Sequence, residues 1–253
     1  MHLILFDCDG TLVDSQHNII TAMRRAFADA GLPAPADAAV RGIIGLSLHA
    51  AVQALAPEDT EPAVLQRLEQ AYKEHFFRLR HEPDFHEPLF PGVREALQAL
   101  HARDDVLLGI VTGKSRRGLE VLLERERLKE HFITLQTADD APSKPHPGMV
   151  LQALEETGAE PQRTVVIGDT RYDMQMARAA NTAALGVGWG YHPPRELLQA
   201  GAHALVHEQE ALAHAPLQLL QCAGMHPAGQ RAAAGDATET HATGRREEEG
   251  MKS

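Results

Sequence analysis

Two aspartates, Asp7 and Asp9, follow a short run of large apolar residues near the start of the chain. Residues two positions apart in a β-strand point to the same side, so both carboxylates start out on one face at the end of this predicted strand. Such close like charges repel, and folding stability gives no reason to place them there. A bound cation, or a reaction in which one carboxylate is the nucleophile and the other the acid, does give a reason.

Three further motifs offer groups that suit the same chemistry. They are Thr112-Gly113 after one predicted strand, Gly168-Asp169 after another with Asp173 four residues later, and Ser143-Lys144-Pro145 before a predicted helix. Ligands of open parallel sheets bind beyond the carboxyl ends of the strands, so we expect these motifs to meet there. Thr112, the backbone N–H of Gly113 and the charge of Lys144 suit the non-bridging oxygens of a phosphoryl group.

The carboxylates at these strand ends suit a hard cation. Mg²⁺ prefers oxygen ligands, binds one or two carboxylates, and keeps waters or substrate oxygens in its shell. Asp7 and Asp169 can supply the carboxylates. Asp173, one helical turn after Asp169, faces the same way and could hold a metal-bound water. The sequence therefore predicts a Mg²⁺ site made of residues that lie far apart in the chain.

The elements that must position these residues alternate along most of the chain. Apolar runs predict strands at Leu3–Phe6, Val106–Val111, Phe132–Leu135, Thr164–Ile167, Thr182–Val187 and Ala204–Val206. Helical stretches at Gly92–Ala102, Ser115–Leu128, Pro147–Gly158 and Arg171–Ala180 separate them. Continuous apolar strands between helices indicate βαβ units and a parallel sheet that is covered on both faces. We predict an α/β fold with a Rossmann-like core.

A helical block separates the first strand from the others. Apolar residues recur at helical spacing through residues 15–82, with Ser47 and Pro62 near the starts of two helices. We therefore predict a small all-helical cap domain, residues 15–82, inserted after the first strand of a core made of residues 1–14 and 83–221. Residues 222–253 contain no Leu, Ile, Val or aromatic residue, so we predict a disordered tail.

Composition limits the partners and the compartment. The net charge of −11 argues against nucleic acid or an anionic membrane, but a local cation would still admit a small anionic substrate. The two cysteines, Cys8 and Cys222, predict no structural disulfide, and no apolar run approaches the ~18 residues of a membrane span. We expect a cytoplasmic monomer or homodimer.

Taken together, Asp-x-Asp-Gly-Thr, Thr-Gly, Ser-Lys-Pro and Gly-Asp-x-x-x-Asp, in this order, resemble the motifs of the haloacid dehalogenase superfamily. Within it, the chain resembles the phosphoglycolate-phosphatase-like hydrolases that carry a helical cap after the first motif. The stretches 11–15 and 168–174 are typical of that group, and the resemblance covers residues 1–215. It implies a phosphatase that acts on a small phosphorylated metabolite.

The resemblance also implies two separate roles for the opening aspartates. Asp7 would be the nucleophile that forms an aspartyl-phosphate. Asp9 would protonate the leaving oxygen and then deprotonate the attacking water, and its backbone carbonyl would ligate Mg²⁺. Uncatalysed hydrolysis of phosphate monoesters is among the slowest reactions known. A covalent intermediate divides this reaction into two easier steps.

The remaining motif residues would bind the phosphoryl group and the metal, by the same resemblance. Thr112 and Lys144 would bind the transferring phosphoryl group, and Lys144 would also restrain the nucleophile. Asp169 would ligate Mg²⁺ directly, and Asp173 would support the metal shell.

Two alternative functions stay open, and we expect the cap domain to determine which substrate is bound. A sugar phosphomutase also keeps both aspartates but usually carries Val where this chain has Thr11. A non-catalytic phosphate-binding module on the same scaffold is the alternative from another class. By analogy, the loop 41–47 is a candidate lid, in which Arg41 could pair with a substrate carboxylate.

Overall fold

The computed structural model describes residues 1–224. Within this range, six parallel strands form one sheet in the order β3-β2-β1-β4-β5-β6. The strands are β1 (His2–Phe6), β2 (Val106–Thr112), β3 (Thr134–Thr137), β4 (Thr164–Gly168), β5 (Ala183–Val187) and β6 (Ala204–Val206). The predicted parallel α/β core is confirmed. The first strand lies at the centre, between β2 and β4, so the carboxyl end of β1 meets the ends of both neighbours.

Helices cover both faces of this sheet. One face packs on α5 (Val93–His101), α6 (Arg116–Glu126) and α10 (Ala215–Gly224), and the other on α7 (Gly148–Thr157), α8 (Arg171–Ala179) and α9 (Pro194–Gln199). In β1, Ile4 and Phe6 face the first set of helices, and Leu3 and Leu5 face the second. A strand that is apolar on both sides is what a sheet covered on both faces requires.

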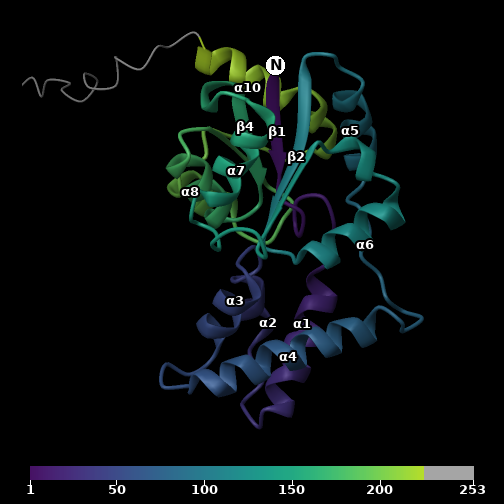
Figure 1. Cartoon of the computed structure of the whole chain (residues 1–253), viewed down its shortest axis with the longest axis vertical. Helices are drawn as coiled ribbons and strands as arrows, with labels where there is room; N and C mark the ends of the chain where they lie inside the picture. The colour runs from purple at the N-terminus through teal and green to yellow at the C-terminus, as the bar shows by residue number, and fades with distance from the viewer. Residues whose placement is uncertain (225–253) are drawn as a thin grey trace, which may run out of the picture.

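The residues between β1 and α5 form a separate helical lobe beyond one end of the sheet (Figure 1). It consists of α1 (Gln16–Asp29), α2 (Asp37–Arg41), α3 (Leu48–Leu55) and α4 (Pro62–Leu79). Local signals set the helix starts: the Ser47 side chain accepts a hydrogen bond from Ala50 N, and Pro62 occupies the first turn of α4. The lobe has its own apolar cluster, built mainly from α1, α3 and α4.

One strand boundary and several short helices differ from the sequence prediction. The third strand begins two residues later, because the apolar Phe132 packs into the core beside the sheet while Ile133 points to solvent. The short helices α2 and α9 were not predicted, since each has at most six residues and shows no clear periodicity. Helix α10 extends to Gly224, so residues 222–224 are not part of a tail. The rest of the predicted tail lies outside the described residues.

The cysteines and the helices agree with the composition. Cys8 is buried and Cys222 exposed, and both are free. Cys8 belongs to the apolar cluster on one sheet face. Within residues 1–224, every helix is too short or too polar to cross a lipid bilayer.

Candidate active site

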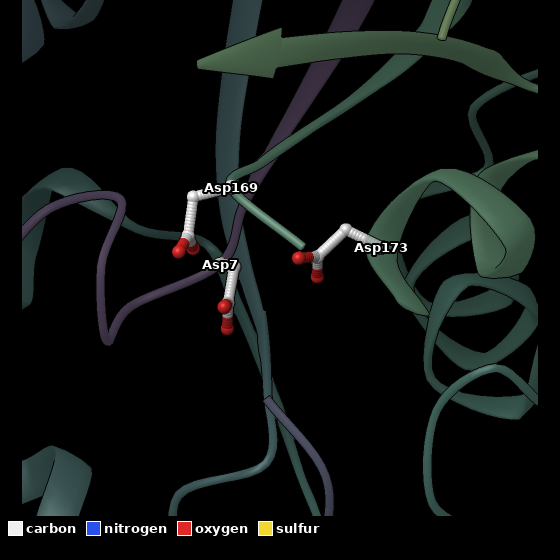
Figure 2. Close-up of side chains that lie close together, drawn as sticks. All are labelled: Asp7, Asp169 and Asp173. Carbon is white, nitrogen blue, oxygen red and sulfur yellow. The ribbon is translucent and has the colours of Figure 1, made fainter. Parts of the chain in front are cut away.

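Three carboxylates meet at the carboxyl end of the sheet. Asp7 follows β1, Asp169 follows the neighbouring strand β4, and Asp173 lies in the first turn of α8. Each offers an oxygen within 4.8 Å of the others, and all three residues are fully buried. Figure 2 shows the three side chains converging from these elements. The predicted meeting of Asp7, Asp169 and Asp173 is therefore present in the structure.

Glycines give these carboxylates the room they need. Gly10 has a φ of +88°, and a Cβ atom there would lie 2.2 Å from Asp169 Oδ2. A Cβ atom on Gly190 would lie 2.1 Å from the Asp169 Cβ. Since real Cβ contacts are never so short, a side chain at either position would push Asp169 out of place. Gly10 thus serves both the turn after β1 and the close approach of a carboxylate.

Lys144 balances part of this negative charge. Its Nζ lies 2.7 Å from Asp7 Oδ1 and 2.6 Å from Asp173 Oδ1, and the lysine side chain is fully buried. The other Asp173 oxygen accepts hydrogen bonds from the backbone N and the hydroxyl of Thr170, which forms a capping box at the start of α8. Asp173 therefore fixes Lys144 beside Asp7, and it does so from a rigid helix start.

Burial raises the pKa values of the Asp7 and Asp169 carboxyl groups. Burial raises the pKa of Asp7 to about 7, although Lys144 opposes the shift. Burial and the charges of Asp7 and Asp173 raise the pKa of Asp169 well above its usual range. Burial lowers the pKa of Lys144, but its two carboxylate partners raise it above the ordinary value overall. Three carboxylates against one ammonium leave an excess of negative charge that a cation would offset.

The donor set fits Mg²⁺. Asp169 has both oxygens oriented, one by the Thr11 hydroxyl at 3.0 Å and the other by Tyr191 N at 2.8 Å. The Asp7 carboxylate is contacted by Lys144 Nζ at 2.7 Å and by no other donor of the described residues. A buried carboxylate with one cationic partner, next to two other carboxylates, offers the all-oxygen ligands of a hard divalent cation.

Asp9 does not join this triad through its side chain. Its Oδ1 accepts a hydrogen bond from Lys114 Nζ at 2.7 Å, and Lys114 also lies 3.5 Å from the buried Glu87. Burial lowers the pKa of Lys114, but Asp9 and Glu87 raise it well above its usual range overall. The strand β1 ends at Phe6 and the chain then turns, so the alternation of a strand does not extend to Asp9. Asp7 and Asp9 therefore have different cationic partners: Lys144 contacts Asp7, and Lys114 contacts Asp9.

A cavity of about 520 Å³ opens beside these carboxylates, between the core and the helical lobe. Thr112 and Gly113 line it from the core; Asp7 and Asp9 lie at its base. The hydroxyl oxygen of Thr112 accepts a hydrogen bond from Lys114 N at 3.2 Å, which leaves its own proton available to a ligand.

The loop between α2 and α3 lies over this cavity, as the candidate lid predicts. A Cβ atom on Gly113 would lie 2.4 Å from the Leu46 carbonyl oxygen, so this glycine permits the loop to approach the core. The loop is tied down by Ser47 N, which donates to Ser143 Oγ at 2.8 Å, and by Tyr172, whose hydroxyl donates to the Gly42 carbonyl.

Arg41 lies elsewhere. It ends α2 and lines a second, shallow hollow together with Asp14, Arg24 and Asp37. The structure does not bring Arg41 to the cavity that contains Asp7. Arg41 was predicted to belong to the loop, but it lies in the last turn of α2 and lines another surface.

Lys114, Glu87 and Tyr191 are site residues that the sequence argument missed. A signal existed for Lys114, because it directly follows Thr112-Gly113 at the end of a strand. Glu87 lies in the Pro-rich exit from the lobe, where an isolated acidic residue is ordinarily exposed. Tyr191 belongs to no motif, and only its long-range contacts identify it.

Tyr191 links Asp169 in the core to the helical lobe, since its backbone N donates to Asp169 Oδ2. Its hydroxyl accepts hydrogen bonds from Ser15 N at 2.9 Å and Gln16 N at 3.1 Å, and donates to Asp14 at 3.2 Å. The Ser15 side chain makes no capping hydrogen bond, so the tyrosine takes the place of an N-cap for α1. We expect Tyr191→Phe to lower the free energy of unfolding by about 1–2 kcal/mol, the usual effect of losing a cap, as measured by urea denaturation.

Tyr172→Phe is the matched control for this change. Its hydroxyl makes one hydrogen bond to the lobe, to the Gly42 carbonyl at 3.1 Å, and no capping contact. We expect a loss of less than about 1 kcal/mol, since one partly exposed hydrogen bond contributes little net free energy. Equal effects of the two changes would contradict the capping role of Tyr191.

Known proteins resemble this chain along most of its length. The family model of haloacid dehalogenase-like hydrolases matches residues 4–187. The chain is 37% identical to the protein named Probable phosphatase IndB of Dickeya dadantii (strain 3937) over 224 residues, which cover 86% of this chain and 95% of that protein. It is 29% identical to the phosphoglycolate phosphatase of Pseudomonas syringae pv. syringae (strain B728a), with 83% of this chain and 78% of the relative covered.

A solved structure agrees with these sequence matches. The crystal structure of a hydrolase from Pseudomonas syringae superposes with a TM-score of 0.75 at 27% sequence identity, and covers 85% of this chain and 98% of its own. The region matched by the family model contains the strand ends that carry Asp7, Thr112 and Asp169. The family predicted from the four motifs is confirmed. The chain belongs to the haloacid dehalogenase-like hydrolases.

Proposed function

We propose that this protein is a Mg²⁺-dependent phosphatase, which hydrolyses a small phosphate monoester through an aspartyl-phosphate on Asp7. The observation that carries the proposal is the environment of Asp7. It is a buried carboxylate whose close donor among the described residues is Lys144, beside two further carboxylates, and it lines a cavity. The names of two relatives, both phosphatases, support the same reaction class.

The residues divide the reaction into two displacements. In the first, Asp7 Oδ2 attacks phosphorus, the bond from phosphorus to the ester oxygen breaks, and that oxygen takes a proton from Asp9. In the second, Asp9 takes a proton from water, and the water oxygen attacks phosphorus, which releases phosphate and restores the Asp7 carboxylate. Because Lys114 holds Asp9 Oδ1, Oδ2 is the atom left to carry the proton.

Other groups bind the phosphoryl oxygens and the metal. Lys144 and the hydroxyl of Thr112 would donate to the non-bridging oxygens, as would the backbone N–H of Gly113. Asp7, Asp169 and the backbone carbonyl of Asp9 would hold Mg²⁺, with Asp173 supporting its shell. When bound, Mg²⁺ supplies a positive charge that offsets the repulsion between a phosphate ester and the buried carboxylates.

Metal removal tests the proposal. We expect the purified full chain to release phosphate from monoesters with Mg²⁺, to lose at least about a hundredfold in rate with excess EDTA, and to recover when Mg²⁺ is restored. Since burial raises the pKa of Asp7 to about 7, protons compete with the metal, and we expect the affinity for Mg²⁺ to fall below that pH.

A screen of phosphate monoesters by phosphate release supplies the measurement. EDTA that has been saturated with Mg²⁺ beforehand is the control, and should leave the rate unchanged. Unchanged hydrolysis in excess EDTA would refute the metal assignment. Isomerisation of a sugar phosphate without phosphate release would instead identify a mutase.

A further inference from the structure

The cavity is larger and more varied than a phosphoryl site needs. Its volume of about 520 Å³ falls in the range that takes drug-sized ligands, about 300–1,000 Å³. The helical lobe contributes a largely apolar wall to it. The wall includes Ile19, Met23, Ile43, Leu46, Tyr72 and Phe76. A two-carbon acid such as the organic part of phosphoglycolate would leave most of this wall without contact.

The cations around the cavity fall into two groups. Lys144 and Lys114 are buried and each is paired with two carboxylates, so their charge is already balanced. Arg80 and Arg117 also line the cavity, but neither guanidinium has an ion-pair partner among residues 1–224. Arg80 is half-buried, and a cation removed from water without a counter-charge favours an anionic ligand.

Both arginines lie where the lobe meets the core. The Arg80 guanidinium lies 5.1 Å from the centre of the Phe76 ring, and Arg117 lies 5.7 Å from that of Phe77. A Cβ atom on Gly118 would lie 3.3 Å from Arg80 Nη2, so the guanidinium rests against the first turn of α6. The positive end of the α6 dipole adds to the charge at this place.

A chain of contacts leads from the reacting carboxylates to this place. Lys114 Nζ touches Asp9 and lies 5.7 Å from the centre of the Phe76 ring, and Arg80 approaches the same ring. The unpaired cations thus lie beyond the groups that serve the phosphoryl transfer. In phosphoglycolate the carboxylate stays next to the phosphate, whereas Lys114 and the Phe76 ring stand between Asp9 and Arg80.

We propose that the substrate is a phosphate monoester whose leaving group has an apolar, ring-sized body and carries a second anionic group at its far end. Arg80, with Arg117 beside it, binds that second anion, which is a carboxylate or a phosphate. The apolar wall of the lobe binds the body between the two anions. This inference rests on the proposed phosphatase function and adds the class of substrate to it.

Matched aryl phosphates test the inference. The substrates are phenyl phosphate, para-carboxyphenyl phosphate, the bisphosphate of hydroquinone, and phosphoglycolate, each assayed with Mg²⁺ for kcat/KM. We expect at least one of the two ring-bearing compounds with a second anionic group to exceed phenyl phosphate in kcat/KM by about tenfold or more, and to exceed phosphoglycolate as well. Which of the two is preferred distinguishes a carboxylate from a phosphate as the second anion.

Substitutions locate the effect. We expect Arg80→Gln to remove most of the preference for the second anion while phenyl phosphate stays within about twofold of the unaltered protein. Arg117→Gln should reduce the preference less, because Arg117 is exposed. The control is Arg78→Gln on the same helix; Arg78 is 66% exposed, pairs with Glu74, and should change nothing.

The outcomes separate this inference from the function on which it rests. Loss of the preference in Arg80→Gln, with a smaller loss in Arg117→Gln, none in Arg78→Gln and unchanged thermal unfolding, supports the inference. Hydrolysis of phenyl phosphate without any preference for a second anion, or a preference that survives Arg80→Gln, overturns it and leaves the phosphatase function intact. If no phosphate ester is hydrolysed by the unaltered protein, the phosphatase function itself fails.

Discussion

Asp7→Asn is expected to lower kcat by roughly 10⁴-fold or more, the scale on which enzymes lose activity with their nucleophile. An amide oxygen does not form the acyl-phosphate that the proposed route needs. Intact-protein mass spectrometry after acid quench should find one phosphoryl group on the unaltered protein during turnover and none on the variant. The fold should survive, since the change keeps the shape and removes one of three buried like charges.

Asp105→Asn is the control for this experiment. Asp105 is exposed and pairs with Arg103 at 3.0 Å, away from the cavity, so turnover should be unchanged. We expect the urea midpoint of Asp7→Asn to be no lower than that of the unaltered protein. Near-normal turnover by well-folded Asp7→Asn would rule out the covalent mechanism.

Lys144→Met should produce the largest loss of stability of the changes considered. The lysine side chain is fully buried and contacts both Asp7 and Asp173, so its removal leaves two carboxylates without their countercharge. Loss of one partner from a buried ion pair costs about 3–5 kcal/mol. We expect that decrease in the free energy of unfolding without metal, by urea denaturation, together with loss of measurable phosphatase activity.

Added Mg²⁺ should recover part of this stability in Lys144→Met, because a cation at the triad replaces some of the missing positive charge. Lys129→Met is the control, since Lys129 is half exposed and pairs with Glu124 at 3.5 Å on the surface. That change should stay within about 0.5 kcal/mol. A Lys144→Met protein as stable as the Lys129 variant would show that the buried pair is not a source of stability.

Local patterns were enough to predict most of the elements. Helix α4 follows from Pro62 and an apolar stripe, and α3 from Ser47 and a shorter stripe. These signals act over one turn of helix or two residues of strand, so a single sequence contains them in full. Elements with weak local signals, such as the five-residue α2, were missed for the same reason.

The cluster of Asp7, Asp169 and Asp173 could also be predicted, although its members are far apart in the chain. Asp7 and Asp169 each follow a buried strand, and the carboxyl ends of parallel strands meet at one edge of the sheet. This rule turns a position in the sequence into a position in space. The rule applies only where a residue directly follows a strand. Both aspartates meet this condition, so their proximity could be predicted.

Only the tertiary structure shows which residues contact Asp9 and which core residues contact the helical lobe. Lys114 lies 105 positions from Asp9 in the chain, and Tyr191 lies 176 positions from Ser15. The Tyr191 hydroxyl accepts a hydrogen bond from the backbone N–H of Ser15. Arg80 lines the cavity, whereas Arg41, at the end of α2 just before the loop that covers the cavity, does not. Such contacts depend on how the helical lobe docks on the sheet, and docking is set by packing of two surfaces rather than by any local pattern. The sequence by itself determined which groups stand at the ends of the parallel strands, and the docked lobe determined which cations line the cavity without a counter-charge, because docking depends on the packing of whole surfaces.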